Sequence, residues 1–246
     1  MASPDIADYA IEKGWWPIHK RNDFDFALAY IDLTRSLQSS QCRVARANQL
    51  LRAKKNGHVS PRWMMRILRD HYETTFLGGP YFNAALPDLI GICMHATPSG
   101  QNWGNTASSS VAIVPKRRDG LAQFWWTPLT PCTGVYVPFF VNGTRVPAVV
   151  SVAGRRGKTV TRPSRIKQDE YSQDSYWWLF RELADIVKRD EVGSAYNLRQ
   201  PAVRRAFDRL EKRFAARIGK VSEQWVELRN AGHERAAAEV LDEFSH

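Results

Sequence analysis

The sequence has little cysteine and no long apolar run, and each absence excludes a class of protein. Its three cysteines, Cys42, Cys93 and Cys132, form no CxxC pair, which argues against a disulfide framework and against a zinc cluster. No apolar run of about 18 residues occurs, and residues 1–8 are polar and acidic, so neither a transmembrane helix nor a secretory signal is expected. We therefore expect a cytoplasmic protein with no membrane partner, no metal and no cofactor.

The common nucleotide-binding and catalytic motifs are also missing. The sequence contains no GxxxxGK phosphate loop, no HExxH zinc motif, no GxSxG nucleophile elbow and no dinucleotide-binding fingerprint. Any catalytic or binding site must therefore be assembled from less obvious residues.

Composition and charge indicate a globular, basic protein. Hydrophobic residues make up 43% of the 246 residues, which is enough for a packed core. The net charge of +10 could attract nucleic acid or another anion. The charges are spread along the chain, and the basic stretch 154–167 lacks interleaved aromatic residues for base stacking. Nucleic acid is therefore disfavoured as a partner.

Sequence patterns predict helices at both ends of the chain and strands between them. The predicted helices cover residues 5–15, 24–37, 43–55, a segment opening at Ser60-Pro61, a segment from Ser172 or Asp174 to about 189, and a pair over 200–242 separated by Gly219. The predicted strands are a central apolar strand over 89–94, and 110–114, 122–127 and 135–141, with turns at Asp119-Gly120 and Asn142-Gly143.

This order predicts an α+β fold with an antiparallel sheet flanked by helices. We expect one domain over residues 1–246, helical over 1–75, stranded over 88–153, a basic loop over 154–172 and helical again over 173–246.

A series of short motifs carries a family resemblance. They are the segments 9–16, 24–30 and 67–71, then ICMH at 92–95, TASSSVA at 106–112, TPCTGVYVPFF at 130–140 and YWWLF at 176–180. In this order they resemble the carboxyl-terminal part of the secernin/dipeptidase family of N-terminal-nucleophile hydrolases, over roughly residues 5–190. The resemblance implies part of a four-layer α-β-β-α sandwich, with this chain supplying the second sheet and its helices.

The resemblance also implies a function. Members of that family cleave linear C–N bonds in peptides or acyl amides with a processed N-terminal Cys, whose α-amino group acts as the base. Here Met1 is followed by Ala2, so we expect the nucleophile to be absent and the chain alone to be inactive. A separate front-half subunit or a second copy would be the protein partner. The alternative is a non-catalytic basic binding protein that kept the scaffold, for nucleic acid or another anionic partner.

Five residues are candidates to line the implied pocket: His95, Asn105, Thr106, Cys132 and Thr133. His95 ends the apolar run, where a strand delivers side chains to a site, and a hydrogen bond to nearby backbone is the alternative. An amide at Asn105 or its neighbour Thr106 could supply an oxyanion donor. The resemblance implies that Cys132 lines the pocket.

Two other residues have ordinary structural interpretations. Cys93 lies among apolar residues and is expected in the core. His71 is expected to pack or to pair with Asp70. A third functional hypothesis, that Cys132 or Cys93 is a new nucleophile, predicts rapid labelling by iodoacetamide at neutral pH.

Overall fold

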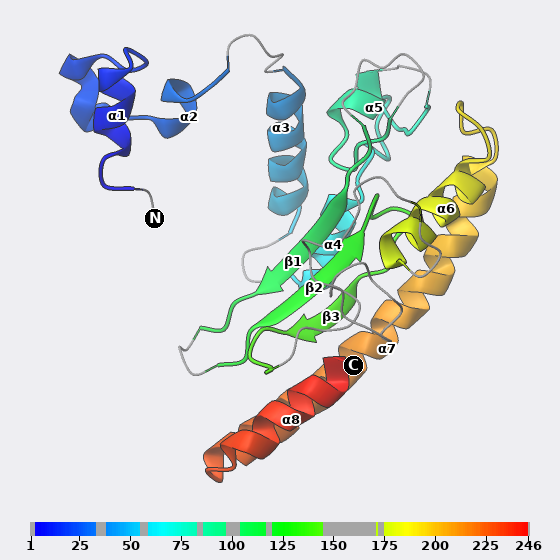
Figure 1. Cartoon of the computed structure of the whole chain (residues 1–246). Helices are drawn as coiled ribbons and strands as arrows, with labels where there is room; N and C mark the ends of the chain where they lie inside the picture. Colours follow the sequence, from blue (N-terminus) through cyan, green and yellow to red (C-terminus); the bar gives the residue numbers. More distant parts are fainter. Residues whose placement is uncertain are drawn as a thin grey trace. The chain divides into compact units, whose positions relative to one another are not determined.

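The computed structural model describes residues 3–32, 38–54, 59–82, 86–96, 104–116, 120–144, 171 and 175–245 (Figure 1). Its contacts divide the chain into two compact units, Met1–Gln41 and Cys42–His246. The first unit has its own small set of packed rings. The basic loop expected over 154–172 lies almost entirely outside the described residues.

The first unit contains α1 (Ile6–Glu12), the 3-10 helix η1 (Ile18–Asp23) and α2 (Phe26–Ala29). Gly14 has a φ of +72°, so the turn predicted there is confirmed. Of the helix predicted over 24–37, the structure shows α2 and a non-helical stretch at 30–32, and residues 33–37 lie outside the described residues. The Tyr30 hydroxyl donates to the Ile6 carbonyl at 2.9 Å. Trp15 packs edge-on against Tyr30 at 5.4 Å between ring centroids.

The second unit begins within α3 (Gln38–Arg52). It continues with α4 (Pro61–Leu68) and α5 (Leu86–Ile90). The start of α4 confirms its sequence signal, since Ser60 Oγ accepts from the Trp63 N–H at 3.2 Å and Pro61 occupies the first turn.

A three-stranded antiparallel sheet in the order β1-β2-β3 confirms the predicted meander. Its strands are β1 (Ser108–Ile113), β2 (Gln123–Pro128) and β3 (Val137–Phe140), and Val111, Trp125 and Pro138 are in register. One face of the sheet forms the core with α4, α7 and α8, through Met65, Val111, Trp125, Phe140, Ile218, Trp225 and Leu241. The described chain is therefore α+β, as predicted.

The apolar segment 89–94 is not a strand, so that prediction is wrong. Ile90 ends α5 and residues 91–96 are irregular. The backbone has different partners on its two sides: the Cys93 N–H donates to the Asp70 carbonyl at 3.1 Å, and the Thr106 N–H donates to the Met94 carbonyl at 2.9 Å. The bond to Asp70 places residues 93–95 beside the end of α4. A strand would instead have formed a continuous ladder of hydrogen bonds with the sheet.

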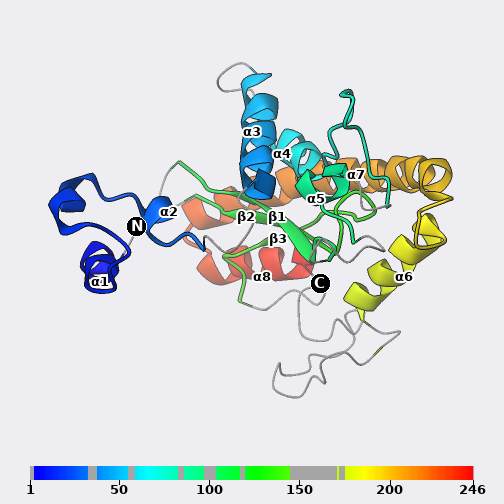
Figure 2. The same ribbon diagram turned by 90° about the horizontal axis from the view of Figure 1, so that it is seen from above.

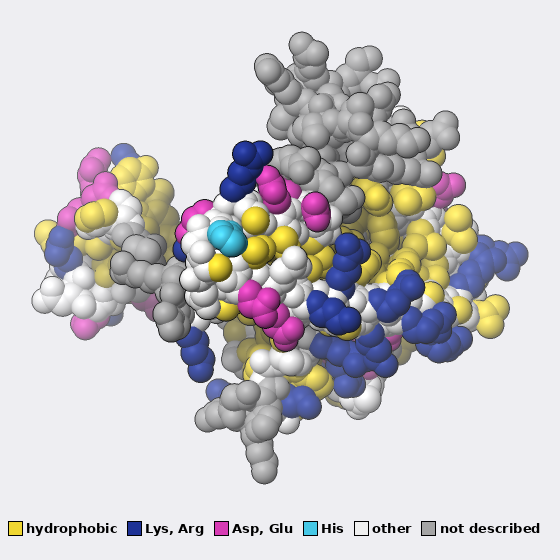
Figure 3. Space-filling model, turned by 90° about the horizontal axis from the view of Figure 1, so that it is seen from below, with side chains coloured by type: hydrophobic (Ala, Val, Ile, Leu, Met, Phe, Trp, Pro, Cys, Tyr) yellow, Lys and Arg dark blue, Asp and Glu magenta, His cyan; other side chains and the backbone are white. Residues whose placement is uncertain are grey.

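The carboxyl-terminal helices are α6 (Tyr176–Lys188), α7 (Tyr196–Asn230) and α8 (Glu234–Ser245). The prediction that Gly219 separates the last two helices is wrong, because α7 runs through it. The break comes at Gly232, which has a φ of +79° and precedes a His233 N–H bonded to the Leu228 carbonyl at 2.9 Å. Beyond it α8 folds back along α7 (Figures 1 and 2). Figure 3, seen from below, shows Lys and Arg side chains gathered on one part of that face. None of the described helices combines the length and apolarity that a membrane span requires.

Candidate metal centre and adjoining cavity

Four buried side chains converge beside the sheet. They are His71, Cys93, His95 and Cys132, and their possible ligand atoms all lie within 4.8 Å of one another. We call this set the Cys2His2 cluster. His71 follows the end of α4, Cys93 and His95 belong to the irregular segment after α5, and Cys132 lies in the turn between β2 and β3. The cluster therefore joins three segments that are separate in the sequence.

A buried ion pair fixes the histidine side of the cluster. The Arg46 guanidinium binds both oxygens of Asp70, with Nε–Oδ2 at 2.8 Å and Nη2–Oδ1 at 2.7 Å. Asp70 Oδ2 also accepts from the Tyr72 N–H at 3.0 Å. Because the Asp70 carbonyl in turn accepts from Cys93, the same residue sets the positions of His71 and Cys93.

Two long polar side chains fix the turn that carries Cys132. Arg69 Nε donates to the Pro131 carbonyl at 2.8 Å, and Gln200 Nε2 of α7 donates to the Cys132 carbonyl at 2.9 Å. Inside the turn the hydroxyls of Thr130 and Thr133 are paired at 2.9 Å. The side chains of Arg69 and Gln200 thus hold the backbone that carries the Cys132 thiol.

The distances within the cluster match the edges of a metal-centred tetrahedron. His71 Nε2 and His95 Nε2 are 3.1 Å apart, and His95 Nε2 lies 3.3 Å from Cys132 Sγ and 3.7 Å from Cys93 Sγ. A tetrahedral zinc ion with ordinary Zn–N and Zn–S bond lengths separates two nitrogens by about 3.3 Å and a nitrogen and a sulfur by about 3.6 Å. The three separations from His95 Nε2 are close to these values.

The outer ring nitrogen of His71 has a carboxylate partner. Its Nδ1 lies 3.1 Å from Glu73 Oε1, while Glu73 Oε2 accepts from the His71 backbone N–H at 2.8 Å. A histidine whose Nδ1–H donates to a carboxylate presents Nε2 as a lone-pair donor, which is the usual arrangement behind a metal-bound histidine.

Without a metal the cluster holds mixed protonation states. Burial raises the pKa of the Cys93 thiol well above its usual value, and the neighbouring Cys132 adds to this effect. Burial also acts against ionisation of Cys132, but its hydrogen bond with Cys93 and the nearby histidines outweigh that cost and leave its pKa well below the usual value. Burial lowers the pKa of His71, yet Cys132 and Glu73 raise it overall to about 10. Chemically, such a thiolate can bind a metal or attack an electrophile.

Aromatic rings close one side of the cluster. Phe82 and Tyr196 contact the His95 ring with centroids 5.1 and 6.0 Å away, both edge-on. Phe82 is itself packed against Gly193, where a Cβ would come within 2.2 Å of the ring. These rings give His95 apolar neighbours on that side, beside a second cavity of about 70 Å³ that they also line.

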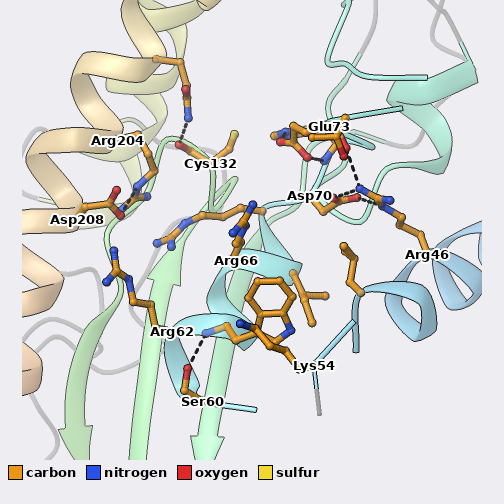
Figure 4. A pocket seen from close by; sticks show the side chains of 17 residues that line it. Arg46, Lys54, Ser60, Arg62, Arg66, Asp70, Glu73, Cys132, Arg204 and Asp208 are labelled. Carbon is orange, nitrogen blue, oxygen red and sulfur yellow. Dashed lines mark hydrogen bonds and ion pairs between the residues drawn. The ribbon is translucent and has the colours of Figure 1, made fainter. Parts of the chain in front are cut away.

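A cavity of about 590 Å³ approaches the cluster from the other side (Figure 4). Cys132 and His71 form part of its wall, and the rest comes from α3, α4, α7 and the residues after α4. Figure 4 shows Cys132 on one side of this space, Asp70 and Glu73 on the other, and Arg62 and Arg66 of α4 below.

The structure brings only two of the five predicted site residues, His95 and Cys132, into the cluster. Asn105 Oδ1 accepts from the Ala96 N–H at 2.9 Å, and Thr106 Oγ1 accepts from the Met94 N–H at 3.0 Å. Both side chains hold the segment that carries His95. Thr133 plays the same part for the turn of Cys132 through its bond with Thr130.

Sequence reasoning missed the other two members, His71 and Cys93. His71 was expected to pack or to pair with Asp70: it is buried, but its carboxylate partner is Glu73, because Asp70 binds Arg46. The only local signal was Cys93 with His95 two residues on, a pair of donors on one short segment. The expectation of no metal was based on the spacing of neighbouring residues. Such spacing cannot show ligands that are distant in the sequence and close only in the folded chain.

No protein-family model matches the chain, and no solved structure matches it. The site itself is therefore the main evidence for function.

Proposed function

We propose that the protein binds one Zn²⁺ ion through the Cys2His2 cluster. The observation that carries this proposal is the convergence of four buried donor atoms within 4.8 Å of one another, with three separations from His95 Nε2 close to the edges of a tetrahedral zinc site. The carboxylate behind His71 supports it, because it orients Nε2 toward the same point.

The donor set selects the metal. Two thiolates and two imidazoles in a tetrahedral arrangement suit zinc, whereas Mg²⁺ and Ca²⁺ prefer oxygen ligands and larger coordination numbers. The cluster offers one ligand atom from each of its four residues. Four protein ligands fill a tetrahedral zinc ion, which is the pattern of structural rather than catalytic sites.

Zinc in this position would join the end of α4, the segment after α5 and the β2–β3 turn. None of these segments is regular at the cluster, and only a few backbone bonds hold them together. Because the site exists only in the folded chain, the free energy of zinc binding adds to the stability of the fold. The proposed role is therefore to stabilise the cavity wall that contains Cys132 and His71.

Metal analysis of the purified protein tests the proposal. We expect about one zinc per chain, as for a single four-ligand site, and loss of zinc in Cys93→Ser and His95→Ala. The matched controls are Cys42→Ser and His233→Ala, since neither residue belongs to the cluster. Substitution with Co²⁺ should give the visible absorption of a tetrahedral thiolate site. Wild-type protein that takes up neither metal, with unchanged folding, would rule the site out.

We propose as a second candidate that the chain is the pocket-forming portion of a dipeptidase-like or amidase-like hydrolase that acts on linear C–N bonds. The specific observation in its favour is that the cavity ends on Cys132, the residue that the motif resemblance assigns to the pocket wall. A volume of about 590 Å³ suits a small peptide. The nucleophile would come from elsewhere.

This candidate also implies a partner for the open face of the sheet. Phe124, Trp126 and Phe139 are half-buried on the face away from the core, and a second sheet packed there would complete the four-layer sandwich. The chain alone should not hydrolyse dipeptides. Addition of a front-half protein bearing an N-terminal Cys should restore hydrolysis, and hydrolysis by the chain alone would contradict the candidate.

A further inference from the structure

The cavity beside the Cys2His2 cluster has more positive than negative side chains. Arg62 and Arg66 are four residues apart on α4, so they project from the same side of the helix. In Figure 4 the Arg66 side chain extends from α4 toward the middle of this space, and the Arg62 side chain extends toward the side that holds Asp208 and Arg204. Lys54, just beyond α3, also lines this space.

The other cations of the cavity are already neutralised. Arg46 is paired with Asp70, and Arg204 with Asp208. Glu211 accepts from both Arg69 and Arg204. These pairs account for every buried or half-buried arginine in the lining, so they leave little charge for a ligand.

Lys54, Arg62 and Arg66 are different, since none of them makes an ion pair with a carboxylate among the described residues. Lys54 and Arg66 lie over the Trp63 ring, at 4.6 and 5.2 Å from its centroid. Contact with a ring orients a cation without neutralising it. Three positive charges therefore line one cavity, and no carboxylate in the described part of the chain is paired with any of them.

We infer that this cavity binds a small molecule through an oxyanion group, a phosphate or a carboxylate, held by Arg62 and Arg66. Guanidinium groups bind such oxyanions through paired N–H donors. The volume of about 590 Å³ lies within the range of small-molecule sites.

The inference depends on the proposed zinc site in one respect, the charge of the part of the cavity wall that Cys132 and His71 form. Two zinc-bound thiolates cancel the charge of Zn²⁺. A zinc-loaded centre therefore adds no net charge beside an anion bound in the cavity.

Calorimetric titration of the zinc-loaded full chain tests the inference, with inorganic phosphate and citrate as separate probes at low ionic strength, where screening is weak. We expect saturable one-site binding of at least one probe, weakened by about tenfold or more when Arg62→Gln and Arg66→Gln remove both guanidinium groups. The matched control is Arg209→Gln with Arg213→Gln, which removes two exposed charges of α7 that do not line the cavity.

The outcomes separate the possible ligands. Binding of phosphate alone identifies a phosphate-bearing ligand, and binding of citrate alone identifies a carboxylate. Absence of binding for both probes, or equal loss in the two double variants, overturns the inference.

Zinc content measured on the same samples separates this inference from the proposed function. Normal zinc with no anion binding overturns the inference alone. Absence of zinc with anion binding that depends on Arg62 and Arg66 overturns the zinc proposal alone. Because both arginines are exposed on α4, the variants should fold, and circular dichroism checks this directly.

Discussion

The Nε2 atoms of His71 and His95 lie 3.1 Å apart inside the protein, and the sulfurs of Cys132 and Cys93 lie 3.3 and 3.7 Å from that same His95 nitrogen. A ring nitrogen carries either one proton or one lone pair, so it can make only one good hydrogen bond. Three partners around it are more than hydrogen bonding can satisfy. A single ion between the four donors satisfies them all, which is why the relationship favours a metal.

Removal of zinc should lower the thermal stability of the protein. If free zinc is about 1,000 times its Kd, binding stabilises the fold by about 4 kcal/mol, which corresponds to a Tm difference of about 8–16 °C for a domain of this size. Scanning calorimetry before and after treatment with a chelator measures it. Cys42→Ser should show the same difference, whereas Cys93→Ser should have the lower Tm from the start and no response to chelator.

Cysteine labelling should depend on the metal. In zinc-loaded protein we expect iodoacetamide to modify half-buried Cys42 and to spare Cys93 and Cys132, because both are buried and coordinated. After chelation Cys132 should become reactive. Mass spectrometry of tryptic peptides assigns each modification. Rapid labelling of Cys132 with zinc in place would instead support its role as a nucleophile.

Glu73 should tune the affinity for zinc without being a ligand. Its carboxylate lies 3.1 Å from His71 Nδ1, and loss of such a partner usually weakens metal binding by about 10–100-fold. We expect Glu73→Gln to fall in this range in a competition assay with a coloured chelator. Glu182→Gln, an exposed change on α6, is the control. An unchanged affinity for Glu73→Gln would show that His71 is oriented by other contacts.

Local signals in the sequence predicted the parts of the fold that local chemistry controls. Ser60 and Pro61 begin α4 because a hydroxyl cap and a fixed φ act within one turn. Burial alternates along β1, and the three strands pair in sequence order. The sequence pattern therefore predicted them. Gly14 likewise closes α1 through its own backbone conformation.

Features that depend on tertiary contacts were not predictable in this way. The apolar run at 89–94 is buried as a strand would be, but its backbone bonds go to Asp70 and Thr106. Gly219 is tolerated in α7, since the packing of Ile218 and Trp225 into the core outweighs the cost of about 1 kcal/mol for a helical glycine. The Cys2His2 cluster was missed because its members come from three segments, and only folding makes them neighbours.

The buried pair of Arg46 and Asp70 should be the most sensitive support of the site. Their side chains are only 5% and 7% exposed, and removal of one member of a buried ion pair costs about 3–5 kcal/mol because the other charge is left unpaired. We expect Arg46→Met to lose stability in this range and to weaken zinc binding, since Asp70 precedes His71 and accepts from Cys93.

An exposed pair on α6 provides the comparison. Arg181 and Asp185 form the same kind of contact at 2.9 Å, but their side chains are 41% and 58% exposed, so Arg181→Met should cost less than about 1 kcal/mol. The double change Arg46→Met with Asp70→Leu should recover part of the stability by removing both buried charges. It should not recover zinc affinity if the position of His71 depends on the Asp70 carboxylate. Urea unfolding with zinc titration of each variant separates the two effects, and equal costs for Arg46→Met and Arg181→Met would show that the buried pair has no special role.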